Sequence, residues 1–107
     1  MNPGRLKDRI TLQRKKEQEG SVIDLDDYED YIPLWSEARF LKGRNFYAAR
    51  AANVKTDVEF IIRYRTDIDE TMGIKFNNRF YEIEGILPLD NNSMYLVVKA
   101  YEVKHDM

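Results

Sequence analysis

Apolar and polar residues alternate along much of this chain, which is the pattern of β-strands that bury one face. Residues 58–64 show it most clearly, because the even-numbered positions are apolar or aromatic and the odd-numbered ones are charged, with Ile61 as the exception. Similar patterns predict strands over Leu6–Arg14, Leu34–Leu41 and Met94–Val103. The chain is therefore expected to be mainly β.

A β-hairpin is predicted shortly after residues 58–64, with its two arms joined at Asn77-Asn78. Asparagine tolerates the positive φ that both central residues of a type I′ turn require. A two-residue turn at this point places Ile74 opposite Tyr81, so that both side chains share one face. The alternation within each arm agrees with this register.

Two long connections separate the strands. Lys15–Pro33 is expected to be an exposed acidic loop, and a docking loop that becomes ordered on a partner is the alternative. Residues 42–56 contain the best helix candidate, Arg44–Asn53, whose alanines favour helix. Together these elements predict a single domain, residues 1–107, built as a small antiparallel β-barrel of about six strands with long loops and one short helix.

For two of the predicted strands, the sequence does not decide which face points to the core or what covers the other face. The alternation in Leu34–Leu41 is imperfect, and it does not decide whether the side chain of Trp35 faces the core. Met94–Val103 is apolar on both faces, which a strand at the edge of a monomer rarely needs. Its second face is expected to be covered either by the short helix or by a neighbouring subunit.

Composition excludes several kinds of chemistry. The chain has 107 residues and no cysteine, so it has no disulfide and no cysteine nucleophile. Its one histidine is His105, so a serine–histidine–aspartate triad would need a base close to the chain end. The spacing of Asp24 and Asp26 superficially resembles a calcium loop, but the glycine and glutamate that such a loop needs are missing. We therefore expect no enzymatic activity and no catalytic residue, cofactor or metal site. No segment approaches the ~18 consecutive apolar residues of a membrane span, and no signal peptide is evident, so a cytoplasmic protein with no membrane partner is expected.

The net charge of −2 hides an uneven distribution. Glu17–Tyr31 holds seven acidic residues and no basic one, which leaves 17 basic and 12 acidic residues, a charge of +5, on the rest of the chain. Basic and aromatic residues alternate in Arg63-Tyr64-Arg65 and in Arg44–Arg50. Such sets either bind single-stranded nucleic acid by stacking and phosphate pairing or form subunit interfaces, and the sequence favours neither.

The chain resembles the SPP1-type phage head–tail joining proteins, also called head-closure or stopper proteins. The resemblance covers nearly the whole chain, and its parts occur in the family's order. These parts are Gly4–Gln13, Leu34-Trp35, a short helix with Tyr47 and Ala48, Phe60–Arg65, a turn with Ile68-Asp69, Met72–Phe76 and Tyr81–Ile86.

The resemblance implies a structural virion protein that is present in the host cytoplasm during assembly. By family resemblance it would form a dodecameric ring. The ring would lie between portal or adaptor ring proteins and a tail-completion or tail-tube protein, and double-stranded DNA would pass through it without sequence recognition. The family's channel or plug loop matches the second connection, with Arg44, Asn45, Tyr47 and Arg50. The candidates for a subunit or ring interface are Asp26, Asp27, Tyr28, Glu29, Asp30, Tyr31, Arg63, Arg65, Tyr95 and Tyr101.

The alternative to a connector is a small barrel, similar to an OB-fold, that binds single-stranded nucleic acid. It predicts salt-sensitive binding of free oligonucleotides through Arg63, Arg65 and nearby aromatic residues. A connector instead predicts little binding to free DNA and a specific association with a portal or adaptor ring.

Overall fold

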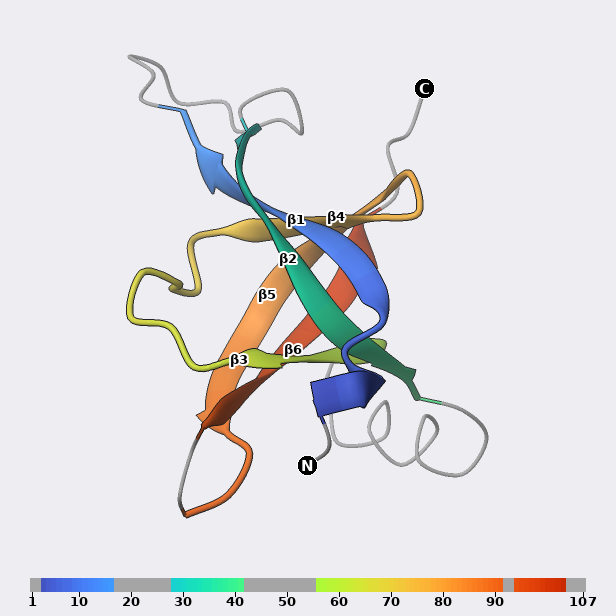
Figure 1. Cartoon of the computed structure of the whole chain (residues 1–107). Coiled ribbons are helices and arrows are strands. Elements are labelled where there is room, and N and C mark those ends of the chain that lie inside the picture. Colours follow the sequence, from blue (N-terminus) through green and yellow to red (C-terminus); the bar gives the residue numbers. More distant parts are fainter. Residues whose placement is uncertain (1–2, 17–27, 42–55, 92–93, 104–107) are drawn as a thin grey trace.

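The computed structural model describes residues 3–16, 28–41, 56–91 and 94–103. Within them, antiparallel strands close into a barrel in the order β1-β2-β3-β6-β5-β4, and β1 and β2 cross in front of β5 and β6 in Figure 1. A short 3-10 turn, η1, precedes the first strand. The elements are η1 (Pro3–Arg5), β1 (Asp8–Lys15), β2 (Tyr28–Phe40), β3 (Val58–Arg63), β4 (Gly73–Phe76), β5 (Arg79–Pro88) and β6 (Tyr95–Val103).

This architecture confirms the prediction of a mainly β, six-stranded antiparallel barrel. The predicted helix Arg44–Asn53 lies outside the described residues. The barrel consists of two three-stranded meanders, β1-β2-β3 and β4-β5-β6, which are joined where β3 pairs with β6 and β1 pairs with β4. Each of these six strands pairs with two neighbours, and the strand number differs from the five of an OB-fold.

The core fills the inside of the barrel with one face of every strand. In β3 the predicted inward residues Val58, Phe60 and Ile62 are all buried, whereas Tyr64 follows the end of the strand and is exposed. Phe60 meets Tyr81 and Phe76 edge-on, with ring centroids 5.4 and 5.7 Å apart. The buried core cluster is Ile10, Leu12, Val58, Phe60, Ile62, Met72, Ile74, Phe76, Tyr81, Ile83, Leu96, Val98 and Ala100.

The predicted hairpin is confirmed in turn and in register. Asn77 and Asn78 have φ angles of 52° and 63°, as a type I′ turn requires, and Ile74 pairs with Tyr81. Further along β5, the register with β6 shifts between Ile83 and Gly85, which is where the arm bends.

Replacing Gly73 by alanine is expected to destabilise the hairpin by about 1–3 kcal/mol. A Cβ at this position would lie 2.5 Å from two ring carbons of Phe80 and 3.3 Å from the carbonyl oxygen of Tyr81. The Phe80 ring also packs on Tyr28 at 4.8 Å, so moving it disturbs a second contact. Urea unfolding followed by circular dichroism measures the loss.

Gly85→Ala is the matched control, because a Cβ there meets nothing within 4 Å. It should change the free energy of unfolding by no more than about 0.5 kcal/mol. Equal losses in the two variants would show that the Gly73–Phe80 contact is not the cause.

The first connection is shorter than predicted, because β2 begins at Tyr28 and not after Pro33. Tyr28 is buried against Phe80, and Ile32 and Leu34 pack against the core. The other residues of this half, Glu29, Asp30, Tyr31 and Pro33, are exposed. Outward carboxylates conceal the apolar alternation in the sequence, which is why this half of the strand looks like a loop.

The structure shows which residues of β2 and β6 face the core, whereas the helix expected over the second face of β6 lies outside the described residues. In β2, Ser36 is fully buried and Trp35 points outward with 55% of its surface exposed. In β6, Leu96 and Val98 line the core, and Tyr95 belongs to the opposite face although it is only 7% exposed.

Candidate functional site

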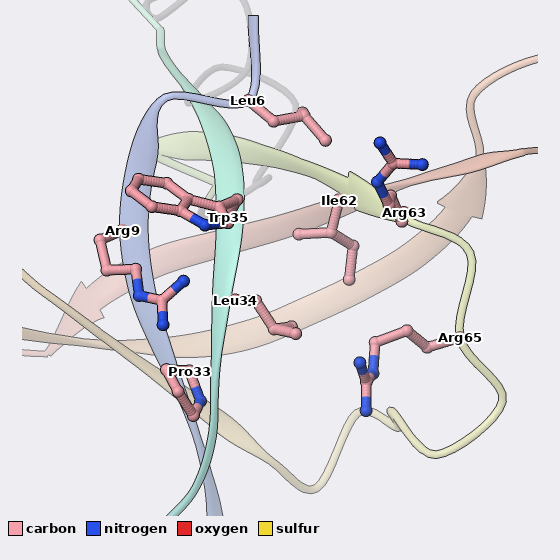
Figure 2. A pocket seen from close by; sticks show the side chains of 8 residues that line it. All are labelled: Leu6, Arg9, Pro33, Leu34, Trp35, Ile62, Arg63 and Arg65. Carbon is pink, nitrogen blue, oxygen red and sulfur yellow. The ribbon is translucent and has the colours of Figure 1, made fainter. Parts of the chain in front are cut away.

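Neighbouring hollows on the outside of β1, β2 and β3 form one concave surface, which we call the Trp35 groove. The first hollow has a volume of about 210 Å³ and the second about 420 Å³, and they share Leu6, Trp35 and Arg63. Figure 2 shows Arg9 and Trp35 on one side and Arg63 and Arg65 across from them. The groove is lined by Leu6, Lys7, Arg9, Pro33, Leu34, Trp35, Ile62, Arg63 and Arg65.

Strand register brings the groove residues together. Arg9 in β1 is the direct partner of Trp35 in β2, and both belong to the outward face. The guanidinium carbon of Arg9 lies 4.7 Å from the centroid of the Trp35 ring, within the range of a cation–π contact. Arg63 is the last residue of β3 and is exposed, so the end of that strand supplies the opposite rim.

Among the described residues, the groove lining contains four basic side chains and no carboxylate. Arg65 is neutralised nearby, since its Nε and Nη2 donate hydrogen bonds of 2.8 and 2.7 Å to the carboxylate of Asp67. Lys7, Arg9 and Arg63 form no ion pair with any residue in the described part of the chain. In the part of the chain that the structure describes, the groove lining therefore presents net positive charge.

A hydrogen-bond network beside the groove ties β2 to the turn after β3. The Tyr31 hydroxyl donates to Asp67 Oδ2 at 2.7 Å, and this hydrogen bond raises the pKa of Tyr31. The hydrogen bonds from Arg65 and Tyr31 hold the pKa of Asp67 well below its usual range, and the Asp67 contact raises the pKa of Arg65. Arg14 lies over the Tyr31 ring at 5.1 Å from its centroid.

Asp67→Asn is expected to destabilise the protein at pH 7 by no more than about 1 kcal/mol, because the network is largely exposed to solvent. A carboxylate whose folded pKa is lowered stabilises the fold above its unfolded pKa, about 3.9, and loses this effect as the pH falls. The stability difference between wild type and variant should therefore be full above about pH 4 and shrink below it. Urea unfolding at a series of pH values measures it, and a difference that persists unchanged at pH 2 would contradict this assignment.

Some of the interface candidates lie within the described residues, and others lie outside them. Tyr28 is buried against Phe80, and Tyr95 is nearly buried, so neither offers much free surface in the isolated chain. The Tyr101 hydroxyl donates to Glu82 at 2.5 Å, and this hydrogen bond together with burial raises the pKa of Tyr101 to about 12. The candidates outside the described residues are Asp26, Asp27, Arg44, Asn45, Tyr47 and Arg50.

The remaining candidates fall into two groups. Arg63 and Arg65 both line the Trp35 groove, and Arg65 also joins Tyr31 through Asp67. At the far end of the β1–β2 pair, Glu29 accepts a hydrogen bond from Arg14, and Asp30 accepts one from Gln13.

Sequence reasoning did not assign Lys7, Arg9 or Trp35 to a site. The strand period does place Arg9 outward, but the imperfect alternation around Trp35 concealed that its ring lies on the same face. The described residues contain no group of three or more His, Cys, Asp or Glu side chains arranged to hold a metal ion. Among them there is also no helix long and apolar enough to cross a membrane.

These features define a small closed β-barrel that has a cationic, partly apolar groove on its outer surface. The profile of the phage head completion proteins matches residues 1–103, and the chain belongs to that family. Its role is accordingly that of a structural component of a phage head, and the resemblance to phage head–tail joining proteins is confirmed.

One solved structure supports the fold independently. The solution structure of protein SF1141 from Shigella flexneri 2a is similar, with a TM-score of 0.73 and 29% sequence identity. The match covers 99% of this chain and 100% of that one. No curated protein matches the chain.

Proposed function

We propose that this protein assembles as a ring between the portal or adaptor ring and the tail. The ring closes the DNA-filled head and provides the surface on which the tail docks. The observation that supports this proposal most directly is the match to phage head completion proteins over residues 1–103, nearly the whole chain. The proposed partners are further copies of the chain, which form a dodecameric ring by family resemblance, together with portal or adaptor proteins and tail proteins.

The described surface suits a ring. A head-to-tail ring contact joins two different faces of one domain, so each subunit needs two chemically distinct surfaces. The Trp35 groove is cationic and partly apolar, whereas the far end of the β1–β2 pair carries mixed charge, because Glu29 pairs with Arg14 and Asp30 accepts a hydrogen bond from Gln13. The two ends of one strand pair thus differ chemically, as a head-to-tail contact requires.

Double-stranded DNA would pass through the ring without base recognition. We propose that Arg44, Asn45, Tyr47 and Arg50 belong to the loop that faces this channel. Cationic side chains neutralise phosphates whatever the base sequence, so such a loop restrains the DNA without reading it.

Complementation of heads tests this function. Heads filled in a host that lacks this chain should lose DNA and fail to join tails, and the purified chain should restore both properties. If heads made without the chain retain their DNA and join tails normally, the proposed function is wrong.

A second candidate function, binding of single-stranded nucleic acid, is favoured by one observation. The exposed Trp35 ring lies among cationic residues, a combination that binds single strands by stacking and phosphate pairing. It predicts submicromolar, salt-sensitive binding of free oligonucleotides, for which a connector has no need.

A further inference from the structure

We infer that the Trp35 groove of one copy of this chain binds the acidic segment Glu17–Asp27 of a neighbouring copy. The inference rests on the proposed ring, for which it names the contact between subunits. It is tested separately from head completion, because binding to a peptide requires no portal, tail or DNA.

The groove has the chemistry of a site for an acidic peptide with apolar side chains. Leu34 and Ile62 lie between its two rims, and Leu6 and Pro33 add further apolar surface. Lys7, Arg9 and Arg63 add positive charge that no ion pair in the described residues neutralises. An apolar floor with a cationic rim fits a ligand that is both hydrophobic and anionic.

The segment Glu17–Asp27 has the complementary composition. Its eleven residues, EQEGSVIDLDD, contain five carboxylates and no basic side chain. Ile23 precedes Asp24 and Leu25 lies between Asp24 and Asp26, while Val22 is one residue further from the carboxylates. Aliphatic side chains can therefore enter the floor of the groove while carboxylates meet its guanidinium and ammonium groups.

Geometry favours a second copy over the chain's own segment. The segment joins β1 and β2 at the pair Lys15–Tyr28, whereas the groove is centred on the pair Arg9–Trp35 and begins at Pro33, the partner of Thr11. Six to seven strand residues separate these pairs, which is about 20 Å at ~3.3 Å per residue. In Figure 1 this end of the two strands lies at the top, and the η1 turn before β1 lies at the bottom.

The chain's own segment is too short to fill its own groove. Residues 16–27 span at most ~43 Å when fully extended, so a loop that returns to its starting strand pair reaches only about 20 Å. It would reach the near edge of the groove at Pro33, but it could not lie along the groove as far as Trp35. A neighbouring copy has no such restriction, and the contact between opposite ends of two barrels is head-to-tail.

A nucleic acid fits the groove less well than the segment does. Its phosphates would find the cations, but the ring of Trp35 is partly covered by Arg9, and the aliphatic floor offers bases no aromatic surface. We therefore assign the groove to protein and use an oligonucleotide as a competing ligand.

Binding of a synthetic peptide, EQEGSVIDLDD, to the full chain tests this inference. Trp35 is the sole tryptophan, so its fluorescence measures occupancy of the groove directly. The peptide should produce a saturable change that weakens as salt is added, because charge pairs at a partly exposed site are screened. A peptide with Asn at the positions of Asp24, Asp26 and Asp27 should bind at least tenfold more weakly.

Arg63→Gln should weaken binding of the acidic peptide by roughly tenfold or more, the usual cost of losing a hydrogen bond to a charged group. The matched control is Arg79→Gln, since Arg79 is exposed and lies outside the groove, and this variant should bind as the wild type does. Circular dichroism verifies that both variants are folded.

Three results would overturn the inference. The first is no saturable binding of the peptide by fluorescence or calorimetry. The second is equal affinity of the wild type and Arg63→Gln for the peptide. The third is tighter binding of a single-stranded oligonucleotide than of the peptide, when both carry equal charge. None of these results bears on whether heads need the chain, so failure here is distinguishable from failure of the proposed function.

Discussion

Replacing Phe60 by alanine is expected to lower the free energy of unfolding by about 3–5 kcal/mol, which is the largest effect of a single substitution that we predict. Phe60 is fully buried in the centre of β3 and makes edge contacts with the rings of Tyr81 and Phe76. These rings come from β5 and β4, so the substitution removes packing between the two meanders. Small domains are stable by only about 5–15 kcal/mol, and the variant should be close to unfolded at 37 °C.

Urea unfolding of the wild type, Phe60→Ala and Phe40→Ala measures this effect. Phe40 is a matched control because it is 45% exposed and stacks on Phe76 at the longer distance of 6.4 Å. Its replacement should cost about 1 kcal/mol, as expected for a partly exposed aromatic pair. If both substitutions had the same cost, the aromatic cluster around Phe60 would not be the centre of the core.

Neutralising Asp26 and Asp27 together, each to asparagine, is expected to reduce the joining of heads to tails at least tenfold. Truncating one member of a close interfacial charge pair costs about 2–5 kcal/mol, much of it from the partner left unpaired. In a ring, every subunit would repeat this loss. Counting tailed particles by electron microscopy after complementation with the purified variant measures the effect.

The control for this variant is Glu70→Gln combined with Glu84→Gln, which changes the net charge by the same amount. Both glutamates are exposed and lie outside the acidic segment. This variant should join heads and tails as the wild type does. Equal joining by both double variants, at wild-type levels, would count against a subunit or ring contact at Asp26 and Asp27.

Local patterns were sufficient to predict most of the barrel. The alternation in β3 gave its buried face, and Asn77-Asn78 gave both the turn and the pairing of β4 with β5. These elements were predictable because each is determined by residues that are close in sequence.

The features that could not be predicted depend on residues that are distant in sequence. The first half of β2 has the composition of a loop, because its outward positions carry carboxylates and a proline. The orientation of Trp35 depends on which face of β2 the closed barrel turns inward, and alternation within one strand cannot show this.

The Trp35 groove was missed for the same reason. It takes Arg9 from β1, Trp35 from β2 and Arg63 from β3, and these residues are adjacent only in the closed barrel. Arg63 and Arg65 were singled out in the sequence as basic residues next to an aromatic one. Their neighbours in space, however, are on other strands.

Addition of the purified chain to its cognate portal–adaptor complex tests the central claim most directly. Electron microscopy of the mixture should show one extra ring of density on the side of the adaptor that faces the tail, built of subunits that fit a six-stranded barrel. If no ring is added to the complex at any salt concentration, while the chain itself is folded, the protein is not the connector described here.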